Sequence, residues 1–370
     1  MTFLPELYEP MTVGSMNVKN RLMMAGMSAG AVADKNGEVA PEMIAYYLER
    51  ARGEPGMMAI GATTVVPPVP GQPNILSFHN DNVIPSMTKL VDAVHEYDTK
   101  FGVQLWNGGG TEMGRHQLIS PSGLSSNVRN ARADDGKGRK TGQPNRALGL
   151  DEIPEIIQYF AEGALRVAEC GFDFVEIHGG HGYLISNFMT PLFNRRTDKY
   201  GGSFENRTRF ILEIVAAVKA AVGDRIGVGL KFNGDDFLGD DGWTLEESCR
   251  LAPLAEAVGA DYITVTAGLV GSPKLTIPPM YEPQGCYTSL AEAVKPTVSI
   301  PVGTIGRIKD PVMARDLVVE GKADFVCLGR PTIADSDIFG KTRRGELSDI
   351  RPCLADCRGC IDEHLIRGGA

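Results

Sequence analysis

The chain has 370 residues, 43% of them hydrophobic and 22% charged, a composition typical of a globular protein with a sizeable core. Its formal net charge of −9 argues against nucleic acid or an anionic membrane as the main partner, while a small anionic ligand could still bind in a local basic pocket. No signal peptide is recognisable in MTFLPELYEPMTVGS, no run approaches the ~18 apolar residues of a membrane span, and the odd number of cysteines disfavours structural disulfides, so we expect a cytoplasmic protein.

Eight short apolar runs recur along the chain, and most are followed by a longer amphipathic stretch. The runs cover residues 21–26, 57–65, 101–106, 172–178, 226–232, 261–267, 300–305 and 324–330. Helical periodicity is seen over 151–171, 204–223, 245–259, 289–296 and 310–322. Buried strands that alternate with helices predict an α/β protein with a (β/α)8 TIM barrel. An open doubly wound sheet is the alternative, although no G-x-G-x-x-G motif follows the first strand.

Residues 107–150 break this rhythm, because they contain no clean strand or helix pattern and are rich in Gly, Ser, Asn and Arg. Six basic residues occur within 129–146, against only Asp134 and Asp135. The segment follows the third strand, so it would lie over the C-terminal face of a barrel, where active sites are built. It could be a solvated excursion or a lid that meets an anionic substrate group.

Glycine and arginine stand at the ends of the last two predicted strands. GTIGRI places Gly303, Gly306 and Arg307 after the seventh strand, and LGRP places Gly329 and Arg330 after the eighth. Backbone N–H groups beside glycine and a guanidinium are suited to an anion, so this pair of strand ends favours a phosphate-bearing ligand.

Gln104 and Lys231 lie at two further strand ends. A flavin with a phosphate tail suits this set, because it also offers a uracil-like edge for the amide and a locus of developing negative charge for the ammonium.

Two of the six histidines and a tyrosine crowd into FVEIHGGHGYL, where the fourth strand ends. His178 and His181 could be a zinc pair, although a third ligand is not evident. They could also be structural, satisfied by backbone groups. In a catalytic interpretation, the two imidazoles stabilise a developing oxyanion and the Tyr183 phenol donates a proton to carbon.

The segment HGGHGYLISNFMTPLFNRRTDKYGGSFENRTRF resembles the signature of the old yellow enzyme family of FMN-dependent ene-reductases. The resemblance extends over essentially the whole chain, including LYEPMTVGSMNVKNRLMMAGMS, FGVQLW, SPSGL, GTIGRI and ADFVCLGRP. It is strongest for the branch of 2,4-dienoyl-CoA reductases, 2-enoate reductases and trimethylamine dehydrogenase.

The resemblance implies a role for each strand end. Gln104 would hold the pyrimidine edge of FMN, and Lys231 would stabilise charge on the reduced ring. His178 and His181 would bind the electron-withdrawing group of the substrate, and Tyr183 would protonate the carbon alpha to it. The other implied FMN contacts are Ala25, Gly26, Met27, Ser28, Gly61, Ala62, Gly303, Gly306, Arg307, Gly329 and Arg330.

The chain departs from the family pattern in three places. QLWNGGG replaces the usual QLxHxGR, so Trp106 and Asn107 could reshape the pocket. No His follows the sixth strand, where Tyr281 is a candidate for substrate contact. No Cys lies near Met27, which excludes a cysteinyl flavin there.

Cys353, Cys357 and Cys360 crowd the C-terminal tail, where large members of the branch carry a [4Fe-4S] cluster. The spacing here is C-x3-C-x2-C and no fourth Cys follows, which leaves either a shortened chain or a natural remnant. Zinc on these cysteines and His364 is a further alternative.

The sequence thus predicts an FMN-binding barrel over 1–345 and a Cys-rich tail over 346–370 that resembles the start of a [4Fe-4S] segment. The expected activity is reduction of an α,β-unsaturated carbonyl, enoate or enoyl thioester, with NADH or NADPH reducing the flavin. Alternatives are an amine dehydrogenase or demethylase, an incomplete barrel within a larger electron-transfer enzyme, and a metal-dependent hydrolase. Expected partners are a small-molecule substrate, with no nucleic acid and no membrane. A homo-oligomer and further C-terminal FAD or NAD domains stay open.

Overall fold

The computed structural model describes residues 4–27, 39–67, 76–109, 119–125, 127–133, 145–269, 271–272, 274, 276–357 and 360. Its centre is a closed barrel of eight parallel strands, in which the last strand pairs with the first. In barrel order they are β3 (Leu22–Met27), β4 (Met57–Thr64), β5 (Lys100–Trp106), β8 (Phe174–Gly179), β9 (Gly227–Asn233), β10 (Tyr262–Thr266), β11 (Val302–Thr304) and β12 (Phe325–Leu328). All eight predicted runs are barrel strands, so the predicted TIM barrel is confirmed.

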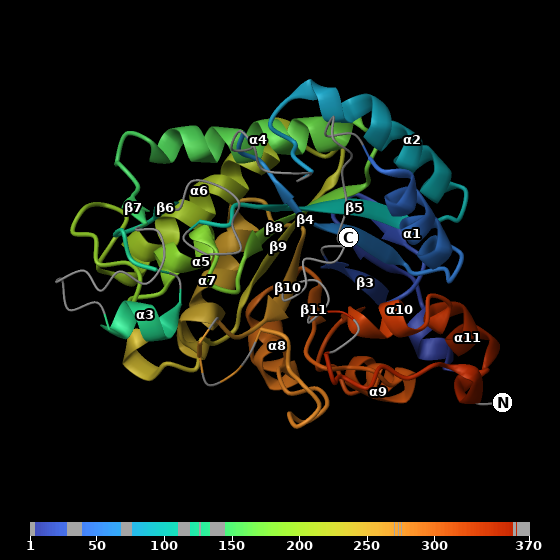
Figure 1. Cartoon of the computed structure of the whole chain (residues 1–370). Helices are drawn as coiled ribbons and strands as arrows, with labels where there is room; N and C mark the ends of the chain where they lie inside the picture. The colour runs from blue at the N-terminus through green and yellow to red at the C-terminus, as the bar shows by residue number, and fades with distance from the viewer. Residues whose placement is uncertain are drawn as a thin grey trace.

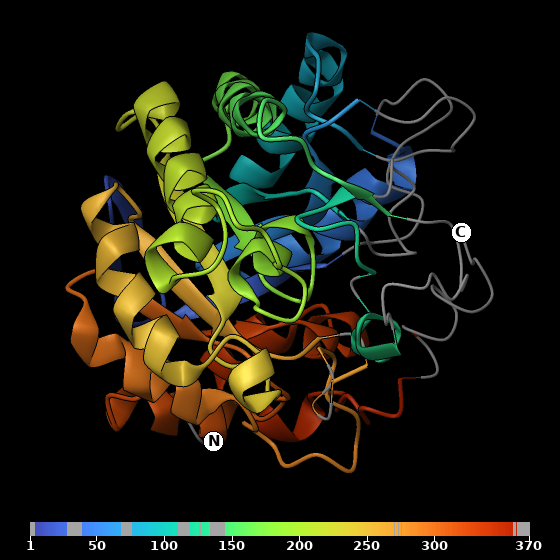
Figure 2. The same cartoon turned by 90° about the vertical axis from the view of Figure 1, so that its left-hand side faces the viewer.

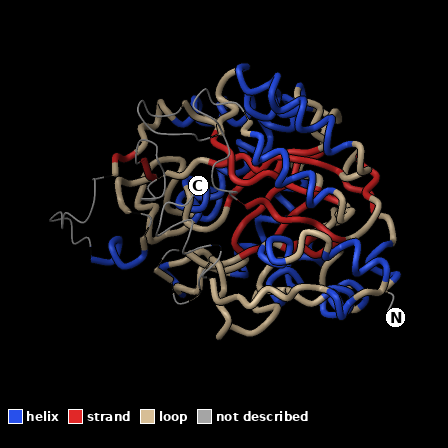
Figure 3. The backbone as a smooth tube through the Cα atoms, turned by 45° about the vertical axis from the view of Figure 1, so that its right-hand side comes forward, coloured by secondary structure: helices blue, strands red, loops and turns tan. Residues whose placement is uncertain are grey.

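Helices surround the barrel (Figure 1 and Figure 3). They are α1 (Pro41–Ala51), α2 (Ile84–His95), α4 (Ile153–Glu169), α5 (Leu184–Met189), α6 (Phe204–Val222), α7 (Leu245–Ala257), α8 (Thr288–Val294), α9 (Pro311–Val319), α10 (Arg330–Ala334) and α11 (Ile338–Arg344). Short 3-10 turns occur at Pro5–Tyr8, Asp81–Val83, Gly239–Asp241, Lys295–Thr297 and Leu347–Asp349. Figure 2 shows α4, α6, α7 and α8 side by side along one wall. The five predicted helices are therefore confirmed, whereas α1 and α2 were not predicted.

Local signals set the bounds of these helices. The Ser203 side chain accepts a hydrogen bond from the Asn206 N–H at the start of α6, which ends at Gly223 with φ +60°. A capping box between Thr244 and Glu247 begins α7. Each signal satisfies backbone groups that a helix end otherwise leaves without partners.

Glycines and aromatic rings fill the barrel interior as complementary pairs. A Cβ at Gly229 would lie 2.0 Å from Cζ of Tyr262, and one at Gly303 would lie 2.3 Å from the Phe325 ring. Close packing of the interior therefore needs glycine at both positions. Gly303, which the sequence assigned to the phosphate site, has this packing role within β11.

A hairpin closes the N-terminal end of the barrel. Its strands are β1 (Met11–Val13) and β2 (Met16–Val18), which pair antiparallel. Val13, Met16 and Val18 join the interior cluster that contains Phe174 and Tyr262. Because this end is plugged by apolar side chains, ligand access to the interior is left to the C-terminal ends of the strands.

The irregular segment after β5 contains more regular structure than its sequence predicted. Its described residues form α3 (Val128–Ala133) and two short strands, β6 (Ile119–Ser120) and β7 (Arg146–Ala147), that pair in parallel.

Across the part of the chain that the structure describes, no helix has both the length and the apolar character required to cross a membrane.

Candidate active site

The two histidines and the tyrosine meet at the mouth of the barrel. His178 lies in β8, one residue before the strand ends, while His181 lies in the turn that follows and Tyr183 precedes α5. The imidazole centroids are 5.0 Å apart, and the Tyr183 ring lies 5.0 Å from His178 and 6.4 Å from His181. Trp106, at the end of β5, packs edge-to-face on Tyr183 at 5.2 Å. A strand end and a turn bring these groups together.

His181 is held in an unusual backbone conformation. Its φ of +63° lies in the left-handed region that side chains other than glycine rarely adopt. Asn233, at the end of β9, accepts the His181 N–H on Oδ1 at 3.0 Å. The His181 ring is fixed from the other side, since Nε2 lies 2.8 Å from Oγ1 of Thr266. Two hydrogen bonds thus hold His181 in a strained backbone conformation, and such strain is found most often at functional sites.

Asp236 supports Asn233 from behind. Its carboxylate accepts hydrogen bonds from Asn233 Nδ2 at 2.7 Å, from Thr190 Oγ1 at 2.6 Å and from the Trp243 N–H at 3.0 Å. These bonds link β9 to the end of α5 and orient the Asn233 amide so that its oxygen meets His181. Burial raises the pKa of Asp236 to about 6, even though the three hydrogen bonds favour the charged form.

This raised pKa makes a prediction about stability. The folded protein binds a proton at Asp236 more tightly than the unfolded chain, whose carboxyl has its ordinary value of 3.8. The contribution of this group to stability is therefore full below about pH 4 and is lost as the pH rises through about 6. We expect the thermal midpoint of the wild type, relative to Asp236→Asn, to fall between pH 4 and 7. Melting curves of both proteins across that range test this, and a constant difference would contradict it.

Burial also fixes the protonation of the catalytic candidates. It lowers the pKa of His178 well below its ordinary value, with His181 and Lys231 adding to the effect, and lowers that of His181 to about 3. It raises the pKa of Tyr183 to about 12. At neutral pH the site therefore presents two neutral imidazoles and a protonated phenol. The Nδ1 atom of His178 accepts the Gly180 N–H at 3.4 Å, which leaves the proton on Nε2.

Several polar groups at the barrel mouth have no protein partner among the described residues. Lys231 is His178's neighbour in the pairing of β8 with β9 and is only 4% exposed. Among the described residues, no hydrogen bond or ion pair engages its ammonium, the Tyr183 hydroxyl, Nε2 of His178 or the side-chain oxygen of Gln104. Buried polar groups are normally satisfied, so a cluster of open ones indicates a ligand site.

Gln104 is anchored from below by a residue that sequence reasoning missed. Its Nε2 donates to Oε1 of Glu176 at 2.6 Å, and Oε2 of Glu176 accepts from Thr264 at 2.9 Å. Glu176 is 1% exposed, inside the barrel. A signal was present in FVEIH, because Phe174, Glu176 and His178 alternate toward the interior.

The ends of β3 and β4 form one wall of the mouth. A Cβ at Gly26 would lie 3.2 Å from Nε2 of Gln104, and one at Gly61 would lie 2.5 Å from the Gly26 backbone. Ala25 belongs to the interior cluster, while Met27 is half-buried and lies beside Gly329. Ser28 and the side chain of Ala62 lie outside the described residues, so their predicted contacts stay predictions.

The two arginines predicted to hold a phosphate both contact the loop after β10. Arg307 donates to the carbonyl of Glu282, and Arg330 donates to the carbonyl of Pro278 at 2.7 Å. Gly306 has φ +148°, and a Cβ there would lie 2.9 Å from the Tyr287 side chain. Gly329 precedes the short helix α10. The predicted residues are thus joined through one loop, although their role in binding phosphate stays a prediction.

The C-terminal tail packs against the same region. Arg330 donates to Sγ of Cys357 at 3.3 Å, and the Arg351 N–H donates to Asp335 at 2.8 Å. Within the described part of the chain, Cys353, Cys357 and Cys360 form no disulfide, and no three His, Cys, Asp or Glu side chains gather into a metal site. The predicted [4Fe-4S] cluster therefore lacks support, and His364 lies outside the described residues.

Two other sequence features are peripheral. Arg132 pairs with Asp241 and Arg146 pairs with Glu152, while Lys137, Arg139 and Lys140 lie outside the described residues. Tyr281, the candidate for substrate contact, is 76% exposed.

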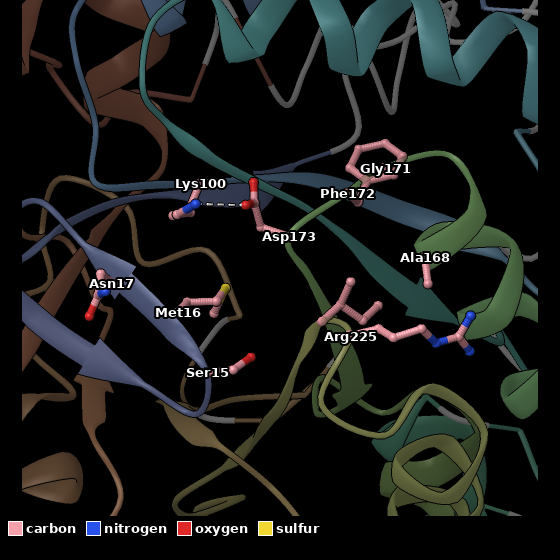
Figure 4. A pocket seen from close by; sticks show the side chains of 10 residues that line it. Ser15, Met16, Asn17, Lys100, Ala168, Gly171, Phe172, Asp173 and Arg225 are labelled. Atoms are coloured by element: carbon pink, nitrogen blue, oxygen red, sulfur yellow. Dashed lines mark hydrogen bonds and ion pairs between the residues drawn. The ribbon is translucent and has the colours of Figure 1, made fainter.

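A polar cavity of about 450 Å³ lies at the opposite, N-terminal end of the barrel (Figure 4). Its charged groups already have partners: Lys100 pairs with Asp173 at 2.9 Å, and Arg225 donates to backbone carbonyls of α6. The mouth with its open polar groups is therefore the better candidate for chemistry.

Comparisons with known proteins identify the family of this chain. The chain is 37% identical to an NADH oxidase of Thermoanaerobacter brockii, over 98% of this chain and 54% of that protein. It is 30% identical to an NADPH dehydrogenase of Bacillus subtilis, over 94% and 96% of the two chains. A solved 2-naphthoyl-CoA reductase in complex with 2-naphthoyl-CoA superposes with a TM-score of 0.88 at 28% identity, over 98% of this chain and 56% of that one.

The chain spans about half the length of the first and third of these relatives and nearly all of the second. The model of the NADH:flavin oxidoreductase / NADH oxidase family matches residues 6–348. These matches include the strands and turns that build the barrel mouth. The chain therefore belongs to the NADH:flavin oxidoreductase / NADH oxidase family, which includes homologues of old yellow enzyme.

Proposed function

We propose that the chain is an FMN-dependent reductase of carbon–carbon double bonds conjugated to a carbonyl, carboxylate or thioester. The observation that carries the proposal is the group of polar side chains at the mouth that have a donor or acceptor atom without a partner among the described residues. They are a cation at Lys231, an acceptor at Gln104, and hydrogen-bond donors at His178 and Tyr183. A flavin below an activated alkene would satisfy all four.

The residues present fit FMN. Gln104 offers an amide oxygen and one N–H to the imide edge of a flavin, and Lys231 offers a positive charge beside it. Arg307, Arg330 and the glycines before them would hold the phosphate. When bound, FMN supplies a hydride to the beta carbon of the substrate. The same cofactor would accept its electrons from NADH or NADPH, in agreement with the names of the relatives.

The histidines and the tyrosine would have separate roles toward the substrate. Nε2–H of His178 and the His181 ring would bind the substrate oxygen, where negative charge develops. Each neutral imidazole has one ring N–H that can donate a hydrogen bond to this oxygen. Tyr183 would deliver a proton to the carbon alpha to the carbonyl, and its raised pKa keeps that proton in place until the carbanion forms.

An amine dehydrogenase fits the site less well. Trp106 and Tyr183 supply two aromatic rings that could face an ammonium. However, Lys231 is close enough to His178 to lower the pKa of that imidazole, so its positive charge would repel a cationic substrate. The proposal therefore names an electron-poor alkene as the substrate.

For the organisation of the chain, we propose an FMN-binding barrel over 1–345 and a distinct tail over 346–370. The tail passes along α10 through the Arg330–Cys357 contact, which is where it would join the phosphate end of the site. No iron–sulfur cluster is included in this proposal.

The purified protein is expected to be yellow and to release FMN on denaturation. The FMN-loaded protein, reduced by NADH or NADPH, should be reoxidised by enones, enoates or enoyl thioesters and not reduced by methylated amines. Absorbance of the flavin in an anaerobic cuvette measures both. A colourless protein that FMN does not reconstitute would overturn the proposal, and reduction by amines alone would replace the alkene with an amine.

A further inference from the structure

We propose that Glu176 is a positioning residue that fixes the Gln104 amide for FMN and sets the charge balance beneath the isoalloxazine ring together with Lys231. This inference rests on the proposed function and extends it to a residue that would not touch the cofactor. Glu176 lies one layer below the mouth, in register with Gln104 on β5 and with Gly229 on β9.

The geometry determines the orientation of the amide. Oε1 of Glu176 accepts from Nε2 of Gln104 at 2.6 Å, and only the nitrogen end of an amide can donate to a carboxylate. The side-chain oxygen of Gln104 is thereby directed away from Glu176 and is left open as an acceptor. An acceptor beside a remaining N–H is complementary to an imide, which offers an N–H next to a carbonyl. Without Glu176, the amide could turn over and present two donors to that edge.

The carboxylate is itself held rigidly. Thr264 donates to Oε2 at 2.9 Å, and the Tyr262 ring packs against Gly229, the residue paired with Glu176, where a Cβ would collide with that ring. Burial and the charge of Glu176 raise the pKa of Tyr262, which agrees with a carboxylate close by.

Glu176 and Lys231 also oppose each other electrostatically. Their effects on Cys327, on β12, have opposite signs: Glu176 raises the pKa of that thiol and Lys231 lowers it, in addition to the dominant effect of burial. A buried carboxylate below a flavin makes the addition of electrons less favourable, whereas the lysine makes it more favourable. The pair therefore tunes the midpoint potential of the bound cofactor.

Glu176→Gln tests both roles. We expect FMN to bind about tenfold more weakly, since one buried hydrogen bond to the cofactor is compromised. We also expect a more positive midpoint potential, because a negative charge is removed. FMN affinity is measured by quenching of flavin fluorescence, and the potential by equilibration with redox dyes.

A double-mutant cycle with Gln104→Ala separates the positioning of the Gln104 amide from a general structural effect on FMN binding. In the Gln104→Ala background, Glu176→Gln should no longer weaken FMN binding, although the shift in potential should persist. Equal weakening in both backgrounds would show a merely structural role and overturn the positioning role. An unchanged potential would overturn the electrostatic role.

Thr264→Val serves in the same cycle if Glu176→Gln does not fold. It removes one anchor of the carboxylate and keeps the charge, so FMN affinity should fall only when Gln104 is present. Failure of the wild-type protein to bind FMN would overturn the proposed function and this inference together. If the wild type binds FMN and the variants have the same FMN affinity and midpoint potential as the wild type, only the inference would be overturned.

Discussion

Tyr183→Phe is expected to slow reoxidation of the reduced flavin by an enone by roughly a hundredfold or more, the range for loss of a general acid. The reason is that the Tyr183 phenol is the proposed proton donor to the alpha carbon, and phenylalanine has no proton to donate there. Reduction of the flavin by NADH or NADPH needs no proton from Tyr183 and should keep its rate. Stopped-flow absorbance of the two half-reactions measures each rate separately.

A matched control for this variant is Tyr159→Phe. Tyr159 lies on α4, with its hydroxyl 2.6 Å from the exposed Glu155, and should leave both half-reactions unaltered. Loss of both half-reactions in Tyr183→Phe would indicate damage to FMN binding rather than loss of an acid. Unaltered rates in both would remove Tyr183 from the mechanism.

Trp106 and Asn107 lie beside Tyr183 and its helix. Its ring packs on Tyr183, and it occupies part of the WNGGG segment where the family pattern has different residues. Asn107 follows the tryptophan, and its carbonyl accepts the N–H of Leu184 at the start of α5. The Trp106 ring and the Asn107 carbonyl therefore both contact the segment that carries Tyr183.

The barrel was predictable because its eight strands are apolar on both faces, a pattern that few other folds share. The hairpin of β1 and β2 was not, since three-residue strands give no usable periodicity. The mouth was predictable as far as strand ends could be identified. His178, Lys231 and Gln104 are there because parallel strands finish at one face of a barrel.

The supporting residues could not be assigned in the same way. Asn233 and Asp236 act through hydrogen bonds to a turn more than 50 positions away in the chain, and only the folded barrel brings them to His181. The left-handed conformation of His181 also leaves no trace in the sequence, because the residue there is not glycine.

Lys231→Met is expected to weaken FMN binding by about a hundredfold, the scale for loss of a charge-assisted contact to a buried ligand. The midpoint potential of the FMN that still binds should become more negative, since a cation that stabilises the reduced ring is removed. This shift is opposite in sign to that expected for Glu176→Gln. Fluorescence titration and dye equilibration measure the two quantities, and Lys89→Met, at an exposed position on α2, is the matched control.

The same substitution should raise the thermal midpoint of the FMN-free protein. Lys231 is 4% exposed, and its ammonium has no hydrogen bond or ion pair among the described residues, so the apo-protein carries the cost of burying it. A residue that destabilises the empty protein and stabilises the loaded one is selected for the ligand rather than for the fold. A lower thermal midpoint for the apo variant, with unaltered FMN affinity, would mean that Lys231 is structural.

In the double variant of Lys231→Met with Glu176→Gln both charges are gone, and the midpoint potential of the bound FMN should return toward that of the wild type.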